Sequence, residues 1–369
     1  MKLLFTGDVN FRGKDELTFE ESKTIISQMQ SFLDSVDFRI VNLECPLGDE
    51  TKYEPIKKAG PNLICSERNL PFLKVFHADA VTLANNHIGD YGEGAIKNTL
   101  SLLEENNILF AGAGKNIEAA YRALRLEKDG IIVSIISVCE NEFGMATENS
   151  YGSAGYNPRL LFKQIKAEKD LSDYVIVVFH GGNEYNPLPS PDTVERYRFI
   201  CDMGADAVIA GHTHCPQGYE IYNDKPIVYS MGNFLFQSAA ERDEKDSWYY
   251  GYMCIIEITD VMKLKTVPYK FNTEATEIIV LGNEMSEYIE ELSKIIQQPE
   301  LLKKHFKGWA YLHQWVPHLE EGQFGGFDLA ECESHHSQMK GILEIYAYQD
   351  FDEAKFWAEE ITKLQKMPI

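Results

Sequence analysis

The chain carries two histidines one residue apart in Gly211-His212-Thr213-His214. They follow an apolar run, residues 205–210, that is typical of a buried strand. Neutral imidazoles at a strand end can both reach one metal cluster. Alone the pattern is only moderately specific, because a pair of loop histidines can also cap neighbouring backbone.

Four other strand-like runs end in residues of metal-ligand type. Asp8 follows residues 2–7, Glu44 comes just after residues 38–41, Asn86 and His87 follow residues 80–84, and His180 follows residues 174–179. Runs rich in β-branched residues indicate strands buried on both faces, and ligands of open α/β sheets bind beyond the carboxyl ends of the strands. Each residue alone could be a helix cap or a turn residue. Together they predict a mixed nitrogen and oxygen site for a divalent ion of the Zn, Mn, Fe or Mg type.

At this point the chain resembles a known family, the CapA/PgsA-like branch (capsule biosynthesis and poly-γ-glutamate synthesis) of the calcineurin-like metallophosphoesterase superfamily. The order and spacing of the shared motifs extend over residues 1–275, and the last ~95 residues match nothing we can name. The motifs are Gly7-Asp8-Val9, Asn42-Leu43-Glu44, Lys58-Ala59-Gly60-Pro61, Leu83-Ala84-Asn85-Asn86-His87 with Asp90-Tyr91-Gly92, Gly112-Ala113-Gly114, His180-Gly181-Gly182-Asn183-Glu184-Tyr185, Pro189-Ser190-Pro191, Gly211-His212-Thr213-His214 and Tyr229-Ser230-Met231-Gly232-Asn233-Phe234.

The resemblance implies a role for each residue of the site. The metal ligands would be Asp8, Glu44, Asn86, His180, His212 and His214. Asp8 and His214 would hold a first metal, and Glu44, in place of the more usual Asp, would bridge to a second one. Asn86, His180 and His212 would hold that second metal. The parent superfamily pattern has a histidine two residues after the first aspartate, where this chain has Asn10, so the first metal could be weakly held, carry an extra water, or be absent.

Such a set would supply hydrolytic chemistry. One or two divalent ions would polarise a phosphoryl oxygen and lower the pKa of a bridging water. His87 would be the catalytic proton donor to the leaving group, although it could instead cap the helix expected from Gly92. Four residues are candidates for contacts with an anionic substrate: Arg12, Lys58, Glu184 and Asn233. The alternatives are solvated cations for the first two, and positioning or turn roles for the others.

Composition limits the class of partner. A net charge of −22 argues against nucleic acid, because proteins that bind a phosphate backbone present a basic face. Seven cysteines without a CxxC motif indicate reduced core thiols. With no signal-like N-terminus and no apolar run of about 18 residues, we expect a cytoplasmic protein without a membrane anchor. The oligomeric state cannot be predicted.

The fold class expected from these patterns is α/β. Apparent hairpin turns at Asp129-Gly130 and Tyr222-Asn223-Asp224 predict mixed sheets. The resemblance implies two stacked mixed β-sheets flanked by helices, a metallophosphatase-like four-layer sandwich. We divide the chain into an α/β domain, 1–275, and a helical C-terminal cap, 276–369.

Within the cap, residues 284–297 and 352–366 are expected to be amphipathic helices. The aromatic cluster around Trp309 and Trp315 is expected to pack as core or to wall one side of the cleft, near the loop 45–62. The pair His335-His336 is expected to bind no metal, since adjacent helical residues do not face each other.

Three functions stay open at this stage. The first is a metal-dependent hydrolase acting on a phosphoester or related anion. The second is an accessory role in making or modifying an anionic polymer such as poly-γ-glutamate or capsule. The third is non-phosphatase chemistry, such as amide hydrolysis or epimerisation, on the same metal scaffold.

Overall fold

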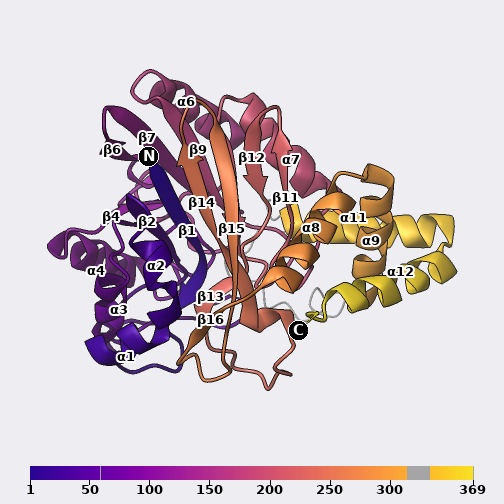
Figure 1. The fold of residues 1–369 in the computed structure, drawn as a ribbon, viewed down its shortest axis with the longest axis horizontal. Coiled ribbons are helices and arrows are strands. Elements are labelled where there is room, and N and C mark those ends of the chain that lie inside the picture. Colours follow the sequence, from indigo (N-terminus) through magenta and orange to yellow (C-terminus); the bar gives the residue numbers. More distant parts are fainter. Residues whose placement is uncertain (59, 314–332, 369) are drawn as a thin grey trace.

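The computed structural model describes residues 1–58, 60–313 and 333–368. Trp315 lies outside the described residues, and so do the side chains of His335 and His336, so the expectations for them remain predictions. Two β-sheets form the centre of the molecule, and helices lie around them (Figure 1).

The first sheet carries most of the N-terminal strand ends. Within the described residues it consists of β1 (Lys2–Asn10), β2 (Phe38–Leu43), β3 (Ala80–Thr82), β4 (Leu109–Ala111), β13 (Asn233–Phe236), β14 (Tyr250–Ile258), β15 (Met262–Phe271) and β16 (Ile278–Val280). Their order is β16-β15-β14-β1-β2-β3-β4, with β13 also paired to β1. Strands β1 to β4 are parallel, whereas β14 is antiparallel to β1, so the sheet is mixed as predicted.

The second sheet carries the histidines. It consists of β6 (Leu124–Lys128), β7 (Ile131–Cys139), β9 (Tyr174–His180), β10 (Ala207–Gly211), β11 (Tyr219–Tyr222) and β12 (Lys225–Val228), in the order β11-β12-β10-β9-β7-β6. Both predicted hairpins are present, since β6 pairs with β7 and β11 with β12. Their turn residues have positive φ, 52° at Asp129 and 50° at Asn223, as two-residue hairpin turns require. A separate ladder joins β5 (Ala113–Gly114) to β8 (Gly152–Ser153).

Helices cover the sheets and extend beyond them. The helices are α1 (Phe19–Ile25), α2 (Gln30–Leu33), α3 (Leu70–Val75), α4 (Gly92–Glu105), α5 (Ile117–Ala120), α6 (Pro158–Lys169), α7 (Pro191–Asp202), α8 (Asn283–Ile296), α9 (Pro299–Leu312), α11 (Glu333–Tyr348) and α12 (Phe351–Leu364). Short 3-10 turns are η1 (Ser27–Met29), η2 (Glu50–Lys52), η3 (Glu67–Asn69) and η4 (Ser247–Tyr249). Helices α6 and α7 pack on the second sheet, and α4 packs beside β4. The α/β class with stacked, helix-flanked sheets is confirmed.

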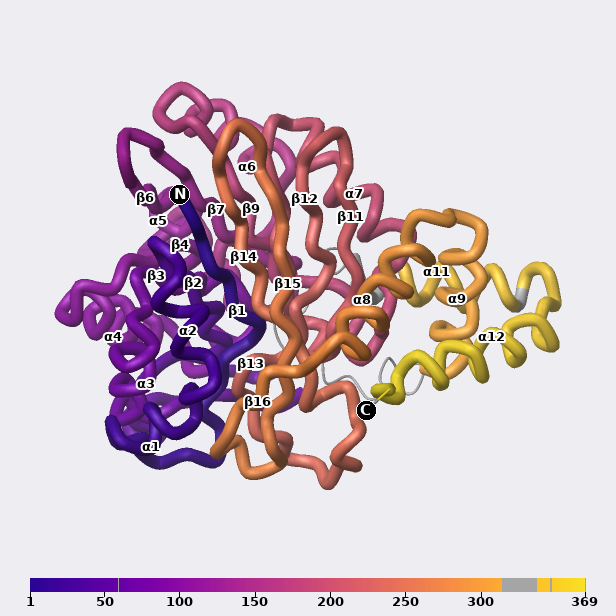
Figure 2. Tube along the Cα trace, viewed as in Figure 1, coloured from indigo at the N-terminus to yellow at the C-terminus, as the bar shows by residue number. Residues whose placement is uncertain are grey.

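The C-terminal helices lie at one side of the sheets (Figure 2). Helix α8 contacts β11 and β15, and α9 contacts α7, α11 and α12. The two amphipathic helices expected here are confirmed as α8 and α12. The expected position near the loop 45–62 is wrong for the described part of this segment, because its apolar faces pack on β11 and α7 instead. A division of the chain at residue 275 stays a prediction, and β16 adds a strand to the first sheet just after it.

The last described residues return to the α/β body. The Gln365 side chain donates to the Tyr185 carbonyl at 2.9 Å, and Met367 is buried, with its N–H donating to the Lys245 carbonyl at 3.3 Å. The C-terminal segment therefore packs against the residues around Tyr185 and Asp246, and the backbone of Asp246 forms an isolated antiparallel β-bridge with that of Lys366.

Candidate metal centre

The six predicted ligands come together at the carboxyl ends of parallel strands. In the first sheet, Asp8 of β1 lies opposite Asn42 of β2, and Asn42 lies opposite Thr82 of β3. In the second sheet, His180 ends β9 opposite Gly211, the last residue of β10. In each parallel pair, the carboxyl ends of the two strands lie at the same edge of the sheet. The six ligands are all buried: Asp8, Glu44, Asn86, His180, His212 and His214.

One group of side chains consists of Asp8, Glu44 and His214, whose donor atoms all lie within 4.8 Å of one another. The Nε2 atom of His214 lies 3.8 Å from Glu44 Oε1. Its Nδ1–H donates to Asn233 Oδ1 at 2.9 Å, which leaves the unprotonated Nε2 facing Glu44, while Nδ1 lies 3.8 Å from Asp8 Oδ2. Asn233 in turn donates to the Trp248 carbonyl at 3.1 Å, so its contacts favour positioning of His214.

The second group consists of Glu44, His180 and His212, again within 4.8 Å. His180 Nε2 lies 3.6 Å from Glu44 Oε1 and 3.2 Å from His212 Nδ1. Asn86 Oδ1 also lies 3.2 Å from His180 Nε2. Glu44 therefore belongs to both groups, as a bridging carboxylate must.

The charges in this cluster are poorly compensated by the protein itself. Burial, followed by the nearby Glu44, raises the pKa of Asp8 to about 7, and burial raises the pKa of Glu44 well above its usual range. Burial also lowers the pKa of His180, and lowers that of His214 to about 3, so both imidazoles stay neutral near pH 7. Among the described residues, neither oxygen of Glu44 has a hydrogen-bond donor, apart from a proton that it could share with Asp8.

These residues fit a divalent cation. Metal–ligand bonds of about 2.1 Å place neighbouring donors about 3.0–3.4 Å apart in octahedral or tetrahedral cages, close to the 3.2–3.8 Å seen here. Neutral imidazoles, an amide oxygen and carboxylates are the donors that Zn, Mn and Fe accept. A cation would also remove the repulsion between the buried carboxylates.

His87 lies beside this cluster in a charged trio. Its Nδ1–H donates to Asp90 Oδ2 at 2.6 Å, and Lys58 Nζ lies 2.5 Å from Asp90 Oδ1 and 3.2 Å from His87 Nδ1. Burial, followed by the charge of Lys58, lowers the pKa of His87, while Asp90 opposes this shift. Asp90 therefore orients both predicted functional residues of the trio.

Asn10 occupies the position where the resemblance to the parent superfamily predicts a histidine, and both ends of its amide make hydrogen bonds. Its Nδ2 donates to the Glu44 carbonyl at 2.8 Å, and its Oδ1 accepts from the Arg12 N–H at 2.9 Å and the Cys65 thiol at 3.3 Å. Asn10 thus fastens the backbone of the shared carboxylate Glu44 to β1.

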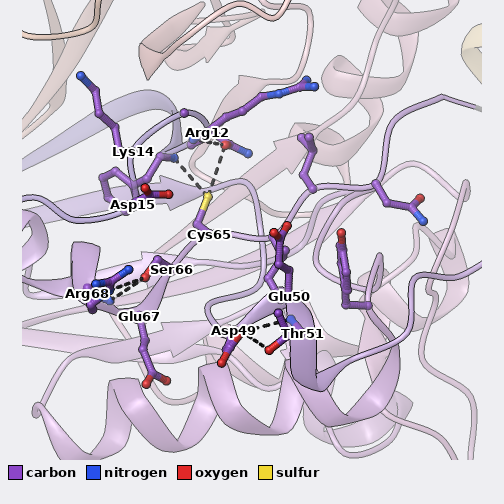
Figure 3. A pocket seen from close by; sticks show the side chains of 18 residues that line it. Arg12, Lys14, Asp15, Asp49, Glu50, Thr51, Cys65, Ser66, Glu67 and Arg68 are labelled. Atoms are coloured by element: carbon purple, nitrogen blue, oxygen red, sulfur yellow. Dashed lines mark hydrogen bonds between the residues drawn. The ribbon is translucent and has the colours of Figure 1, made fainter.

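Of the other predicted substrate-binding residues, Arg12 lines a different cavity and Glu184 lies near the metal-ligand cluster. Arg12 lines a separate cavity of about 550 Å³, whose walls include Asn10, Lys14, Asp49 and Glu50 and none of the six predicted ligands (Figure 3). Glu184 lies closer to the cluster, where its charge raises the pKa of Glu44. Burial raises the pKa of Glu184 itself, and Lys58 opposes that rise.

Three residues near the cluster were not among the predicted site residues. Asn42 donates to Asp8 Oδ1 at 2.6 Å, Asp90 holds His87, and Glu142 lies 3.7 Å from His212. Asn42 and Asp90 stand inside the family motifs, so their place beside predicted ligands was a usable signal. Glu142 belongs to no such motif.

The stacked sheets and the buried cluster at their strand ends define an α/β protein with a candidate metal centre. The chain belongs to the bacterial capsule synthesis protein family PGA_cap, whose model matches residues 2–238. The matched segment contains all six predicted ligands and ends before the C-terminal helices.

Two relatives illustrate the similarity. The chain is 30% identical over 231 residues to the capsule biosynthesis protein CapA of Bacillus anthracis, covering 60% of this chain and 56% of that protein. It is 26% identical over 243 residues to the PGA biosynthesis protein CapA of Bacillus subtilis (strain 168), covering 64% of each. The matches thus span less than two thirds of the length of these relatives.

Solved structures are more distant. A hypothetical protein from Thermus thermophilus matches with 15% identity and a TM-score of 0.46, over 73% of this chain and 99% of that one. A 5'-nucleotidase precursor from the same organism matches with 12% identity and a TM-score of 0.42, over 82% and 59%. Among the residues described here, no helix is both long and apolar enough to cross a membrane.

Proposed function

We propose that this protein is a metal-dependent hydrolase acting on a phosphoester or a related anionic substrate. The observation that carries the proposal is the position of Glu44, whose carboxylate is shared by two groups of potential ligands. Asp8 and His214 would hold one ion with Glu44. Asn86, His180 and His212 would hold the other.

When bound, two such ions would polarise a phosphoryl oxygen and lower the pKa of a water between them. The protein's own side chains would position the metal ligands and supply the proton for the leaving group. Asn233 directs His214 toward the cluster, and Asn42 holds the Asp8 carboxylate. Lys58 forms a buried ion pair with Asp90, which holds its ammonium group beside His87.

His87 is the proposed proton donor to the leaving group. Its Nδ1–H is held by Asp90, so Nε2 is the ring atom left to exchange a proton with substrate. Burial and Lys58 disfavour the charged imidazolium. A bound anionic substrate would oppose both effects and favour protonation, which is the state a proton donor needs.

A second candidate is an accessory role in poly-γ-glutamate or capsule polymer synthesis. The family description and the two CapA relatives favour it. The departure at Asn10 also favours other chemistry on the same scaffold, such as amide hydrolysis. A cytoplasmic location stays part of the proposal, and the six described cysteines, all free and buried, support a reducing compartment.

The test combines metal analysis with a substrate screen. Wild type, Glu44→Gln and Glu54→Gln would be purified without added metal, then loaded with Mn²⁺ or Zn²⁺ and assayed on phosphomonoesters, phosphodiesters and γ-glutamyl peptides. Glu54 is an exposed glutamate of the same loop and serves as the matched control. We expect metal and turnover in wild type and the control, and loss of both in Glu44→Gln. Turnover of γ-glutamyl peptides alone would favour the second candidate, and an absence of metal binding in wild type would contradict the proposal.

A further inference from the structure

Glu142 is an acidic residue at the metal centre that the hydrolase proposal leaves without a role. It follows β7 by three residues, and its side chain is only 9% exposed. Burial, together with Glu140 and Glu184, raises the pKa of Glu142 to about 8. A carboxyl group held in such surroundings needs contacts that account for its position.

Glu142 contacts two residues of the second ligand group and orders both. Its Oε1 lies 3.7 Å from Nε2 of His212, and the side chain of Asn86 is close enough to lower the pKa of the carboxyl group. In both His212 and Asn86, more than one side-chain atom could face the metal. Either ring nitrogen of a histidine can bind a metal, and an asparagine amide can present an oxygen, which binds metal, or an NH₂ group, which does not.

The contacts of Glu142 remove both ambiguities in the same direction. With Nε2 of His212 facing Glu142, Nδ1 faces the cluster, where it lies 3.2 Å from His180 Nε2. Oδ1 of Asn86 faces the cluster, also 3.2 Å from His180 Nε2, which leaves its NH₂ group as the part of the amide that can donate toward Glu142.

We propose that Glu142 is a positioning residue that selects the metal-binding atom of both His212 and Asn86. The inference rests on the proposed function, since it presupposes the metal centre. In the first group the neutral Asn233 serves His214 in a similar way. Glu142 differs because it is an acidic group, and a carboxylate that orients a ligating imidazole makes it a stronger ligand, which would strengthen the second site selectively.

The experiment measures metal binding, so it does not depend on turnover. Wild type, Glu142→Gln, Glu142→Asp and the control Glu148→Gln would be titrated with Mn²⁺ by calorimetry and with Co²⁺ by visible absorption. Glu148 is an exposed glutamate in the same segment after β7. We expect Glu142→Gln to weaken one of two sites by about 10–100-fold, the range typical of groups that orient metal ligands. The Co²⁺ band of that site should shift, while the other site and the control stay within about twofold of wild type.

Glu142→Asp keeps the acidic group and should lose less affinity than Glu142→Gln, which supports the role even if the Gln variant folds poorly. Wild-type affinity at both sites in the two Glu142 variants would overturn the positioning role and leave the metal centre standing. An equal loss at both sites, with a lower melting temperature of the metal-free variants, would also overturn it in favour of a purely structural residue. Wild type that binds no metal would instead remove the hydrolase proposal itself.

Discussion

Asp90→Asn tests whether the trio of Lys58, His87 and Asp90 is held together by charge. The side chains of Lys58 and Asp90 are 1% and 0% exposed, and their charged atoms lie 2.5 Å apart. Removing one partner of a buried ion pair leaves the other charge uncompensated, at a cost of about 3–5 kcal/mol. Asparagine is nearly isosteric with aspartate, so little of that loss would come from packing.

A double-mutant cycle separates the charge effect from other losses. In Asp90→Asn, the Lys58 ammonium stays buried without its carboxylate. In Lys58→Met the aspartate keeps two hydrogen-bond donors, His87 Nδ1–H and the Leu63 N–H at 2.7 Å, so the loss is smaller. The double variant should therefore recover at least about 2 kcal/mol relative to Asp90→Asn alone.

Urea unfolding with a chelator present gives the free energies without a contribution from bound metal. Asp49→Asn is the matched control, since Asp49 and Lys52 form an ion pair at the surface, and it should leave the stability unchanged within error. A loss below about 1 kcal/mol in Asp90→Asn, or a double variant no more stable than the single one, would refute the reasoning.

Three further predictions concern the metal centre and the C-terminal tail. His212→Ala should lose metal and activity together, whereas His87→Ala should keep its metal and lose about 10²–10⁴-fold in turnover. Metal analysis and rate measurements on both variants check this. Equal metal loss in the two variants would make His87 a ligand. The metal-free protein should lose stability as pH rises from about 6.5 to about 9, because the folded-state pKa values of Asp8 and Glu142, about 7 and about 8, lie above their unfolded values, so the folded state binds more protons. Urea unfolding across that range measures the slope, which saturating Mn²⁺ should reverse, and a flat profile would contradict it. A stop codon after Leu364 should lower the free energy of unfolding by about 2–4 kcal/mol, because the burial of Met367 and the hydrogen bond of Gln365 are lost. The metal content should stay unchanged. Loss of metal would show that the tail supports the metal centre directly.

The strand ends could be predicted from the sequence because their signal is local. Apolar, β-branched runs identified β1, β2, β3, β9 and β10, and the register of parallel pairs brings their carboxyl ends together. The hairpin turns were likewise set by neighbouring residues that tolerate positive φ, such as Asp129 and Asn223.

The remaining features depend on contacts between distant segments, which local patterns do not encode. Glu142 reaches His212 across 70 positions of sequence only because β7, β9 and β10 are neighbours in one sheet. The place of the C-terminal helices was mispredicted for a similar reason. An amphipathic face indicates that a helix has a partner surface and leaves the choice between the loop 45–62 and α7 open.

Glu44 and Asn10, the two residues that differ from the parent superfamily pattern the sequence resembles, are hydrogen-bonded to each other. A glutamate in place of aspartate carries its carboxylate one methylene farther from the backbone, so the same position between two ions requires a different backbone placement. Asn10 supplies an anchor for that backbone through its hydrogen bond to the Glu44 carbonyl at 2.8 Å. A histidine at position 10 would add a ligand to the first group but remove this anchor, together with the hydrogen bonds to Arg12 and Cys65. The position that looks like a lost ligand in the sequence therefore has a role in the structure, which is to hold the carboxylate shared by both groups.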